Sequence, residues 1–567
     1  MHEHQADVVV VGAGIAGLAA AHRLTSAGVR TVVLEAAHGV GGRMATEKVD
    51  GFRLDRIGHL LSTAHPELHR VPALDGLAVL PFAPGVLLHG EGRHHRVGAP
   101  AGTGGARGAR GALHAVRALA GAPRPGPAGA LPAARHPAPV LPGPGWTPGR
   151  VLGWAPGRIP GRAPARVPGR TPGWAPGRAP TGGSGGTPGG GSGGTPVGGS
   201  GGTPVGGSGG TPVGEPGRTP AGEPGRTPAW APGRASGRGT VGLASVPRAR
   251  AAAPLGTAVD QARLGAALAR LAHTPVERLL ARPELPAARA LAARGLPART
   301  VDGFLRPLLA ALLCDPDLTT SSRCADLALR AFASGRLGLP AGGAEALPQL
   351  LARTLPPGTV RTGVRAVSVA TNAVTTAEHG VVRCRAVLVA TDAGAAAELL
   401  PGLRVPDFHP VTVVHHTTDE PPATGAWLLL DADRGGPVAH TAVVSEVDPS
   451  RAPAGRALVS STVLGTPPAD VDTAVRGHLA RLYGTPTARW ETLAVHHTAE
   501  AVPVMRPPHD PRRPVRLLAG LYVCGDHRDT STVQGALRSG RRASAAILAD
   551  LGVDRPMHTA DPLPTAA

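Results

Sequence analysis

The stretch that most constrains the fold of this chain is VVVVGAGIAGLAAAHRL, residues 8–24. Its first four residues are β-branched and apolar, which predicts a parallel strand buried on both faces. Three glycines follow with the spacing G-x-G-x-x-G: Gly12, Gly14 and Gly17. This spacing allows a tight turn, lets backbone approach a phosphate, and lets the next helix pack close to the strand. We therefore predict a helix from Ile15 to about Ala27, with a dinucleotide pyrophosphate at its N-terminus.

An acidic residue completes this unit. A second strand is predicted over residues 31–34, and Glu35 at its end is placed to accept hydrogen bonds from the adenosine ribose. A carboxylate there repels a 2′-phosphate, which argues against NADP. The same glycine spacing recurs at Gly189, Gly191 and Gly194. That copy has no strand before it and no helix after it, so it predicts no second dinucleotide site.

The positive charge of the chain is concentrated in one region. The formal net charge is +19, and residues 101–250 contribute +15 of it through 17 arginines and two glutamates. The rest of the chain carries only about +4, which is ordinary for a soluble enzyme. The charge distribution therefore disfavours nucleic acid as a partner of the folded part.

Low-complexity sequence fills residues 122–253, where GWAPGR, GGSGGTPV and GEPGRTPA recur. These repeats have almost no aliphatic side chains to bury, so we predict that the segment is disordered. A stacked solenoid is the alternative for a periodic sequence. The segment 122–253 also contains four tryptophans and many arginines, residue types that can bind RNA. A second alternative is therefore a flavin-containing scaffold or RNA-interacting protein that uses this segment.

Several other patterns exclude classes of protein. The four cysteines form no C-x-x-C pair, so we expect neither a disulfide framework nor a zinc site, and we expect a cytoplasmic location. No signal peptide and no membrane span is predicted, and any membrane contact is expected to be peripheral. Two histidine pairs, residues 415–416 and 496–497, cannot chelate locally because adjacent strand residues point to opposite faces. We predict no metal site.

The remaining sequence predicts a mixed architecture. Residues 258–297 and 301–335 have helical apolar spacing, and PLLAALLC at 307–314 is predicted to be a core helix. Residues 358–391 and 401–500 alternate as strands do. The fold class is therefore α/β.

Two further motifs bear on the bound dinucleotide. Gly41, Gly42 and Arg43 follow the second strand, and such glycines bring backbone near phosphate while an arginine adds donors. Near the C-terminus a strand ends at Gly525 and Asp526, and a helix begins near Val533. An aspartate there can hold a polyol hydroxyl, and the helix dipole can stabilise negative charge on a flavin ring.

Together these stretches resemble the superfamily of flavin-containing amine oxidases and phytoene desaturases, which includes protoporphyrinogen oxidase. The matching segments are GAGIAGLAAAHRL, VLEA, VGGRMAT, LPAGGAEALPQLLARTLPPGTVRTGVRAVSV, CRAVLVATDAGAAAELL and YVCGDHRDTSTVQGALRSGRRAS. They cover most of residues 5–550 apart from the insert. The resemblance implies an FAD-binding Rossmann-like domain assembled from discontinuous segments, an inserted mixed α+β substrate domain, and noncovalently bound FAD.

The resemblance also implies contacts for individual residues. The pyrophosphate would lie against Gly12, Gly14, Ile15 and Ala16, and the ribose against Glu35. Gly42 and Arg43 would follow the phosphate–ribityl chain, and Val364 would touch adenine. The ribityl chain and isoalloxazine would be lined by Gly525, Asp526, Thr532 and Val533.

Two departures from the family pattern affect the chemistry. Ile57 and His59 stand where relatives often carry an Asp-x-Gly-type turn beside the flavin, and His59 is the single catalytic candidate. Many amine oxidases hold a lysine, through water, near flavin N5, but the sole lysine here is Lys48, in the wrong part of the chain. Cys524 is expected to be a small buried residue, and Trp490 either packs in the core or reaches the substrate.

These expectations give a domain map and a function. The FAD-binding domain is predicted from residues 1–98, 341–400 and 501–550, and the substrate domain from 99–121, 254–340 and 401–500, with the insert at 122–253 and a tail at 551–567. The expected function is an FAD-dependent oxidoreductase that removes hydride from a C–H bond of a small or medium apolar substrate, with oxygen or a quinone as electron acceptor. An amine oxidase that produces peroxide is the alternative.

Overall fold

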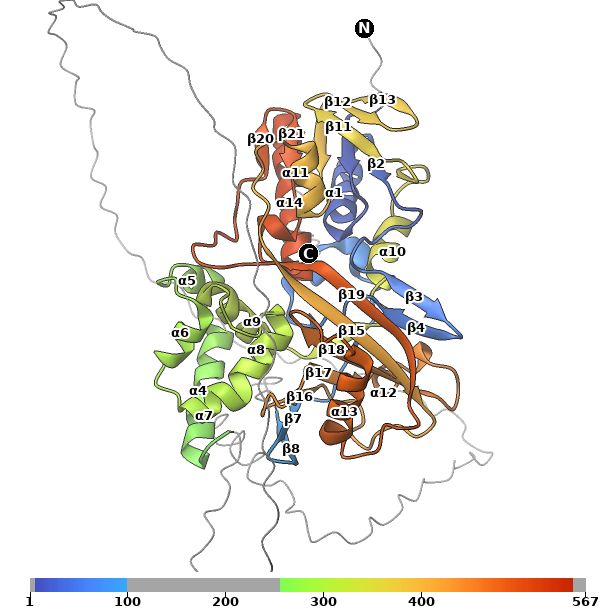
Figure 1. Cartoon of the computed structure of the whole chain (residues 1–567). Helices are drawn as coiled ribbons and strands as arrows, with labels where there is room; N and C mark the ends of the chain where they lie inside the picture. Colours follow the sequence, from blue (N-terminus) through green and yellow to red (C-terminus); the bar gives the residue numbers. More distant parts are fainter. Residues whose placement is uncertain (1–5, 99–254, 554–567) are drawn as a thin grey trace, which may run out of the picture. The chain divides into compact units, whose positions relative to one another are not determined.

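The computed structural model describes residues 6–98 and 255–553 (Figure 1). The predicted insert and the C-terminal tail from residue 554 lie outside the described residues. The described residues form two main sheets and a set of helices, so the predicted α/β class is confirmed.

The first sheet has six strands, and five of them are parallel to one another. In spatial order the strands are β10 (Val360–Thr362), β2 (Thr31–Glu35), β1 (Val8–Val11), β14 (Ala386–Val389), β21 (Leu521–Val523) and β20 (Arg516–Leu518). Only β20 runs antiparallel to its neighbour. The strands come from three distant parts of the chain, as expected for a domain assembled from discontinuous segments.

Both faces of this sheet are covered, which explains the apolar run in β1. Val8 and Val10 pack in a core with helices α1 (Ile15–Ser26), α10 (Ala346–Arg353) and α14 (Val533–Asp550). Val9 and Val11 pack on the other side in a core that includes Val374 and Val382. These two come from a three-stranded antiparallel sheet of β11 (Ala366–Ala370), β12 (Ala373–Thr376) and β13 (Gly380–Arg383). Helix α11 (Ala393–Leu399) follows β14 on this side.

The second sheet has seven strands and is antiparallel except between β16 and β7. Its order is β19 (Glu491–Pro503), β15 (Phe408–Thr418), β18 (Ala457–Leu464), β17 (Val438–Val443), β16 (Leu429–Asp431), β7 (Val86–Gly90) and β8 (Arg93–Val97). The hairpin β7–β8 thus pairs with this sheet, although the predicted map gives residues 1–98 to the FAD-binding part. The alternating pattern of a hairpin does not specify which sheet it joins.

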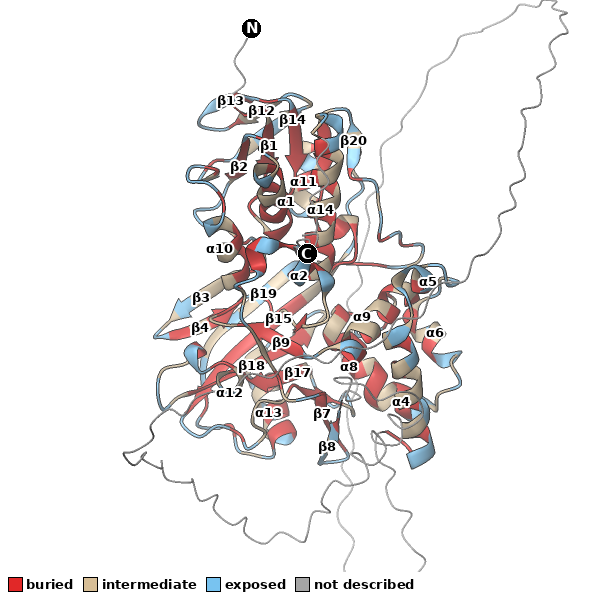
Figure 2. Ribbon diagram, turned by 180° about the vertical axis from the view of Figure 1, so that it is seen from behind, coloured by how far each residue is buried: buried red, intermediate tan, exposed pale blue. Residues whose placement is uncertain are grey.

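Helices cover both faces of the seven-stranded sheet. Helix α13 (Val471–Tyr483) packs on one face through Val475 and Leu479. The other face shares a core with the helical segment of residues 258–334. That segment comprises α4 (Ala258–His273), α5 (Val276–Leu280), α6 (Ala287–Ala292), α7 (Ala298–Thr300), a π-helical turn (Val301–Leu305), α8 (Arg306–Leu313) and α9 (Ser322–Ser334). Figure 2 shows the buried residues along the inner faces of these elements.

Short elements link the two sheets. The hairpin of β3 (Thr46–Val49) and β4 (Phe52–Asp55) leads into β5 (Leu61–Ser62), which pairs with β9 (Leu337–Pro340) beside β6 (Val79–Pro81). Short helical turns are α2 (Pro66–Arg70), α12 (Val444–Val447) and the 3-10 turns Pro72–Leu74, Pro449–Arg451 and Asp526–Arg528.

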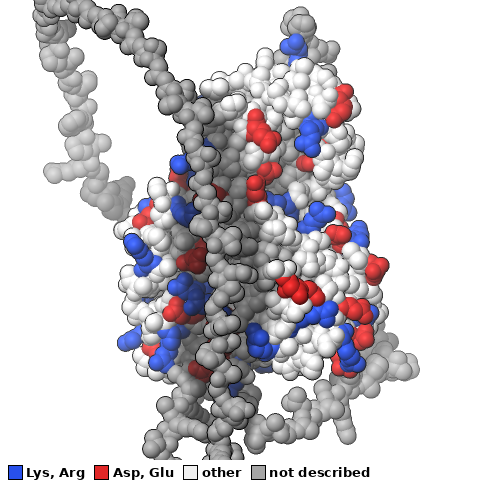
Figure 3. Space-filling model, in the orientation of Figure 1, with Lys and Arg blue, Asp and Glu red and all other residues white. Residues whose placement is uncertain are grey.

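The surface of the described residues carries mixed charge. On the face shown in Figure 3, basic and acidic side chains are interspersed. Within the described ranges, no helix combines the length and the apolar character that crossing a membrane requires.

Candidate functional site

A cavity of about 630 Å³ lies at the carboxyl ends of the parallel strands. Residues at the carboxyl ends of β1, β2, β14 and β21, or just after them, contribute to its wall, for example Gly12, Glu35, Ala390 and Gly525. In open α/β sheets the carboxyl ends of the strands are where ligands bind, because the loops there leave backbone groups unpaired. We call this space the large cavity.

The three glycines of the turn after β1 have different surroundings. Gly12 has φ +106°, and a Cβ there would lie 2.9 Å from the Ala390 carbonyl oxygen. A Cβ on Gly17 would lie only 2.2 Å from the Gly12 carbonyl oxygen, so Gly17 permits the close packing of α1. At Gly14 a Cβ would meet no atom within 4 Å, because this residue faces the large cavity. The N-terminus of α1 therefore opens directly onto the cavity.

Glu35 braces this turn from the neighbouring strand. Its carboxylate accepts hydrogen bonds from the backbone N–H groups of Ala13 at 2.7 Å and Ala37 at 2.9 Å. Its carbonyl oxygen accepts from the N–H of Val364 at 2.9 Å. Glu35 and Val364 are thus adjacent in the wall of the large cavity.

Arg43 and Asp526 form an ion pair in the wall of the large cavity. One Arg43 nitrogen donates to Asp526 Oδ1 at 2.6 Å, and another donates to the Ala501 carbonyl oxygen at 2.7 Å. Burial raises the pKa of Asp526, but the adjacent Arg43 charge outweighs burial and holds that pKa below its usual value. The pair therefore stays ionised and ties β19 and the loop after β21 to the glycine pair before Arg43.

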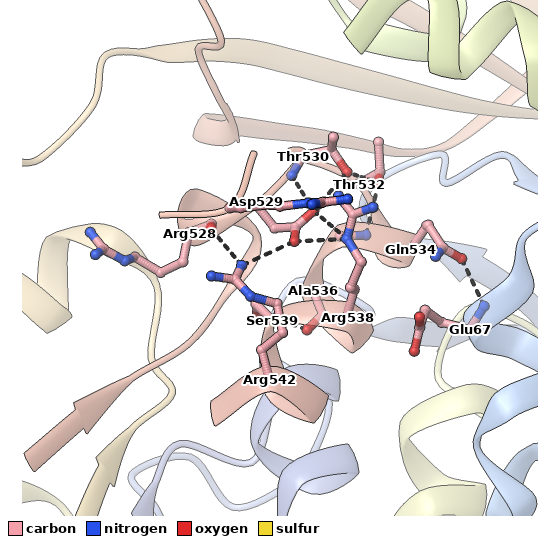
Figure 4. A network of polar contacts seen from close by, with 12 residues as sticks. Glu67, Arg528, Asp529, Thr530, Thr532, Gln534, Ala536, Arg538, Ser539 and Arg542 are labelled. Carbon is pink, nitrogen blue, oxygen red and sulfur yellow. Dashed lines mark hydrogen bonds and ion pairs between the residues drawn. The ribbon is translucent and has the colours of Figure 1, made fainter. Parts of the chain in front are cut away.

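A buried polar network fixes the loop between β21 and α14 (Figure 4). The Asp529 side chain is fully buried and pairs with Arg538 and Arg542. Arg538 Nε lies 2.8 Å from Asp529 Oδ2. Thr532 caps α14 by accepting from the Gly535 N–H at 3.0 Å, and Ser539 accepts from the Gly525 N–H at 2.9 Å. The network holds the N-terminus of α14, with Thr532 and Val533, at the cavity wall.

His59 also lines the large cavity, within electrostatic reach of the Arg43–Asp526 pair. Its Nδ1 lies 3.0 Å from the Ile57 carbonyl oxygen. Burial lowers the pKa of His59, and the Arg43 charge lowers it further, so the ring is neutral at pH 7. The segment 57–60 also borders a second cavity of about 40 Å³, which we call the small cavity: Gly58 and Leu60 line it, whereas His59 lines the large one.

The structure places every predicted cofactor contact except Gly17 in the wall of the large cavity. Sequence reasoning missed part of that wall, namely Thr391, Asp392, Ala395, Glu398, Ala501, Val502 and Ser531. One signal was available: Asp392 follows a buried strand and caps α11 by accepting from the Ala395 N–H at 2.9 Å. Ala501 and Val502 had none, because they lie at the end of a strand of the other sheet.

The other residues considered in the sequence analysis make contacts that stabilise the fold. His415 bonds Ser460 and the Asp55 carbonyl oxygen, and His416 bonds Asp472. Trp490 packs against Tyr483 in the core. Burial raises the pKa of the Cys524 thiol to about 12, so it stays protonated.

One set of possible metal ligands occurs among the described residues: His89, Asp431 and Asp433. Both carboxylates already accept backbone N–H groups of the adjoining turns. Asp431 also accepts from His478 at 3.1 Å. The two carboxylates thus have structural hydrogen bonds of their own.

The large cavity fits a flavin dinucleotide. Its wall offers unhindered backbone at Gly14 and Gly42, two helix N-termini for phosphate and ring charge, and the carboxylate of Glu35. The Arg43–Asp526 pair adds polar partners for the chain between them. These are the donor and acceptor types that an extended dinucleotide requires.

Comparison with known proteins agrees with this reading. The model of the flavin-containing amine oxidoreductase family matches residues 223–548, more than half of the chain. The model of an NAD(P)-binding Rossmann-like domain matches residues 10–72.

Individual relatives match over short segments. Pyridine nucleotide-disulfide oxidoreductase domain-containing protein 2 of Rattus norvegicus is 44% identical over 64 residues, which is 11% of each chain. Putrescine oxidase of Kocuria rosea is 52% identical over 62 residues, 11% of this chain and 13% of that protein. The chain thus matches only about a tenth of the length of these relatives.

Solved structures match along nearly the whole chain. An oxidoreductase from Methanosarcina mazei aligns with a TM-score of 0.55 and 13% identity, covering 95% of this chain and 99% of that one. Cyclohexylamine oxidase from Brevibacterium oxydans aligns with a TM-score of 0.52 and 14% identity, covering 96% and 99%. At these identities the likeness concerns the fold. The family match confirms the predicted FAD cofactor and oxidoreductase class: this chain belongs to the flavin-containing amine oxidoreductase family.

Proposed function

We propose that this flavoenzyme removes hydride from a C–H bond of a small or medium apolar substrate, in the manner of a desaturase or dehydrogenase. Bound FAD supplies the acceptor for two electrons. The chain's own residues bind and orient the cofactor, and they shield the reacting bond from water. His59 is the candidate for a residue beside the reacting atoms, where a neutral imidazole can accept a proton.

The placement of the single lysine carries this proposal. Lys48 lies in β3 with its side chain 67% exposed, and its Nζ is 3.7 Å from Glu345. It does not line the large cavity. The lysine that many family members hold near flavin N5 therefore has no counterpart here, and that lysine assists the reaction of reduced flavin with oxygen. We expect oxygen to be a slow electron acceptor and a quinone to be a faster one.

The cofactor would lie along the large cavity with its adenine near Val364 and its ribose at Glu35. Its phosphates would lie at Gly12, Gly14, Ile15 and Ala16. Gly42 and Arg43 would follow the phosphate–ribityl chain, and the ring would lie toward Gly525, Asp526, Thr532 and Val533. Gly17 supports this arrangement through packing, since it lies outside the cavity wall.

Anaerobic flavin bleaching tests the substrate class. The FAD-loaded enzyme is mixed with putrescine and cyclohexylamine, and in parallel with uncharged cyclic and polyene compounds, while absorbance is followed. We expect bleaching by an uncharged compound and little or none by the amines. Reoxidation is then timed with air and with a soluble quinone, and the quinone should be faster.

Amine oxidation is the second candidate function, because the short match to putrescine oxidase is 52% identical. Rapid, saturable peroxide production from a simple amine would favour it over the desaturase proposal. In both cases we expect FAD to be released by acid or heat. Flavin that stays with the denatured chain would show a covalent bond and contradict this expectation.

A further inference from the structure

The small cavity lies next to the part of the large cavity that contains His59. The segment 57–60 separates them, since its alternate residues line one cavity or the other. The seven-stranded sheet contributes the apolar Val413 and Ala442 and four polar residues, His415, His440, Ser460 and Thr462. The other apolar residues of the wall, Leu60, Phe82, Leu339, Leu428 and Val444, lie outside the strands of that sheet. A space of about 40 Å³ admits a group of a few atoms rather than a whole substrate.

Arg451, in this wall, has one donor without a hydrogen-bond partner among the described residues. The side chain is only 1% exposed. Its Nε donates to the Arg53 carbonyl oxygen at 2.8 Å, and its Nη2 pairs with Asp55 at 3.0 Å. Its Nη1 is buried and has no hydrogen-bond partner among the described residues. A buried guanidinium N–H without an acceptor is costly, so a group that accepts from it gains affinity.

His440 adds a second polar atom to the same wall. The residue is 5% exposed, and its Nδ1 is buried without a partner among the described residues. Burial lowers the pKa of His440 to about 4, so its ring is neutral at pH 7 and can donate or accept one hydrogen bond. His415 also lines the cavity, but both of its ring nitrogens are already hydrogen-bonded.

The charges around the small cavity cancel. Asp55 neutralises Arg451, and its carboxylate is fully engaged: Oδ1 accepts from Thr46 at 2.7 Å and from the Ala344 N–H at 2.9 Å. A carboxylate ligand would add an unpaired negative charge to this buried site, and an ammonium ligand would add an unpaired positive charge beside Arg451. Both are disfavoured by the cost of burying a net charge.

We propose that the small cavity is a substrate anchor, in which Arg451 Nη1 and His440 Nδ1 bind an uncharged oxygen, a carbonyl or a hydroxyl, at one end of an otherwise apolar substrate. This inference rests on the proposed function and names its substrate class. The apolar wall at Val413 and Leu428 would contact the carbon atoms beside that oxygen. The part of the substrate that carries the reacting C–H bond would extend past the edge of the segment 57–60 to the His59 side.

Four matched ring compounds test the anchor on the FAD-loaded, full-length protein. Cyclopentanone carries the oxygen, methylenecyclopentane replaces it with a CH₂ group, and cyclopentylammonium and cyclopentanecarboxylate carry opposite charges. Ligand-observed NMR titration gives the dissociation constant of each. We expect cyclopentanone to bind about 10- to 100-fold more tightly than methylenecyclopentane, the effect of a hydrogen bond to a charged donor. We expect both ions to bind more weakly than the ketone.

Three variants locate the effect. Arg451→Lys keeps a charge beside Asp55 but removes the Nη1 donor, and it should reduce the preference for the ketone to about threefold or less. His440→Leu fills the same space without a polar atom, and it should reduce the preference for the ketone in part. This second variant keeps the test valid if Arg451→Lys does not fold. Val413→Ala is the matched control: it should weaken ketone and hydrocarbon binding alike and leave their ratio unchanged.

The anchor is refuted if ketone and hydrocarbon bind equally, if either ion binds best, or if no probe binds. Failure of the proposed function has a different signature. Bleaching of the flavin by an amine, with the ketone preference intact, would refute the desaturase proposal and leave the anchor. Bleaching by an uncharged substrate, without any ketone preference, would refute the anchor and leave the desaturase proposal.

Discussion

The large and small cavities are constructed in opposite ways. The large cavity lies among glycine turns, helix N-termini and loops that follow parallel strands. Six residues of the small cavity lie on antiparallel strands of the seven-stranded sheet, and the ion pair in its wall joins Asp55 to Arg451 across almost 400 residues. The cofactor region is therefore sensitive to any added atom in a few short motifs, whereas the substrate region is sensitive to the chemistry of side chains that are far apart in sequence.

Two glycines give the largest expected contrast between the regions. Gly17 lies in α1 against the cofactor-binding turn, and Gly265 lies in α4 of the substrate region. We expect Gly17→Ala to reduce the free energy of unfolding by about 3 kcal/mol or more and to abolish FAD retention, because its Cβ would overlap backbone at 2.2 Å. Denaturant unfolding and the flavin content of the purified protein measure both effects.

Gly265→Ala is the matched control. A Cβ at that position would meet no atom within 4 Å. We expect it to raise the free energy of unfolding by about 0.5–1 kcal/mol through helix propensity. Equal destabilisation by the two substitutions would contradict the view that backbone packing distinguishes the cofactor region.

Asp529 gives the next largest effect. Its fully buried carboxylate pairs with Arg538 and Arg542, so Asp529→Ala would leave two arginines without their partner. We expect a loss of about 3 kcal/mol of stability, together with weaker FAD binding because the loop before Thr532 would loosen. Thermal unfolding with and without added FAD separates the two losses.

The exposed pair of Arg506 and Asp407 serves as the comparison for Asp529. Asp407→Ala should change the free energy of unfolding by no more than about 0.5 kcal/mol, since exposed ion pairs contribute little. A similar loss in both variants would show that the Asp529 network does not organise the cofactor loop.

In the substrate region we expect the largest effect on how the free energy of unfolding depends on pH. Burial lowers the pKa of His440 to about 4, whereas an unfolded histidine titrates near 6.5. Between pH 6.5 and 4 the unfolded state binds a proton that the folded state does not, so stability falls as pH falls. His440 contributes up to about 3 kcal/mol to that loss.

We expect His440→Leu to flatten this acid-side decrease, measured as unfolding free energy from pH 7 to pH 4. His415, His65 and His527 also have pKa values lowered to about 4, so part of the slope will remain.

The contrast also explains what could be predicted from the sequence. The strand at residues 8–11, the helix after it and the start of α14 were predicted within a residue or two, because each depends on a contiguous pattern. The pairing of β7–β8 with β16 and the Asp55–Arg451 pair were not predicted. Such contacts join segments with no shared periodicity, and only the assembled sheet brings them together.

A substitution of Glu35 is expected to have the smallest effect on the protein. It tests whether the glycine turn alone accounts for FAD binding. Its carboxylate accepts two backbone N–H groups, from Ala13 and Ala37, and would also accept from the ribose. Glu35→Gln keeps the shape but leaves one oxygen and adds an N–H₂ group that can face a donor. We expect the FAD dissociation constant to rise about tenfold, which corresponds to one to two hydrogen bonds.

Glu398, another carboxylate of the same cavity wall, is the control for Glu35. The substitution Glu398→Gln should change the FAD dissociation constant less than threefold, because this side chain does not brace the glycine turn. Equilibrium titration of the apoprotein with FAD measures both constants. If Glu35→Gln binds FAD as tightly as the unaltered chain, the glycine turn holds its shape without the carboxylate, and backbone geometry alone accounts for cofactor binding. If instead its affinity falls by more than a hundredfold, Glu35 contributes far more than its two visible hydrogen bonds, and the cofactor region depends on side chains as strongly as the small cavity does.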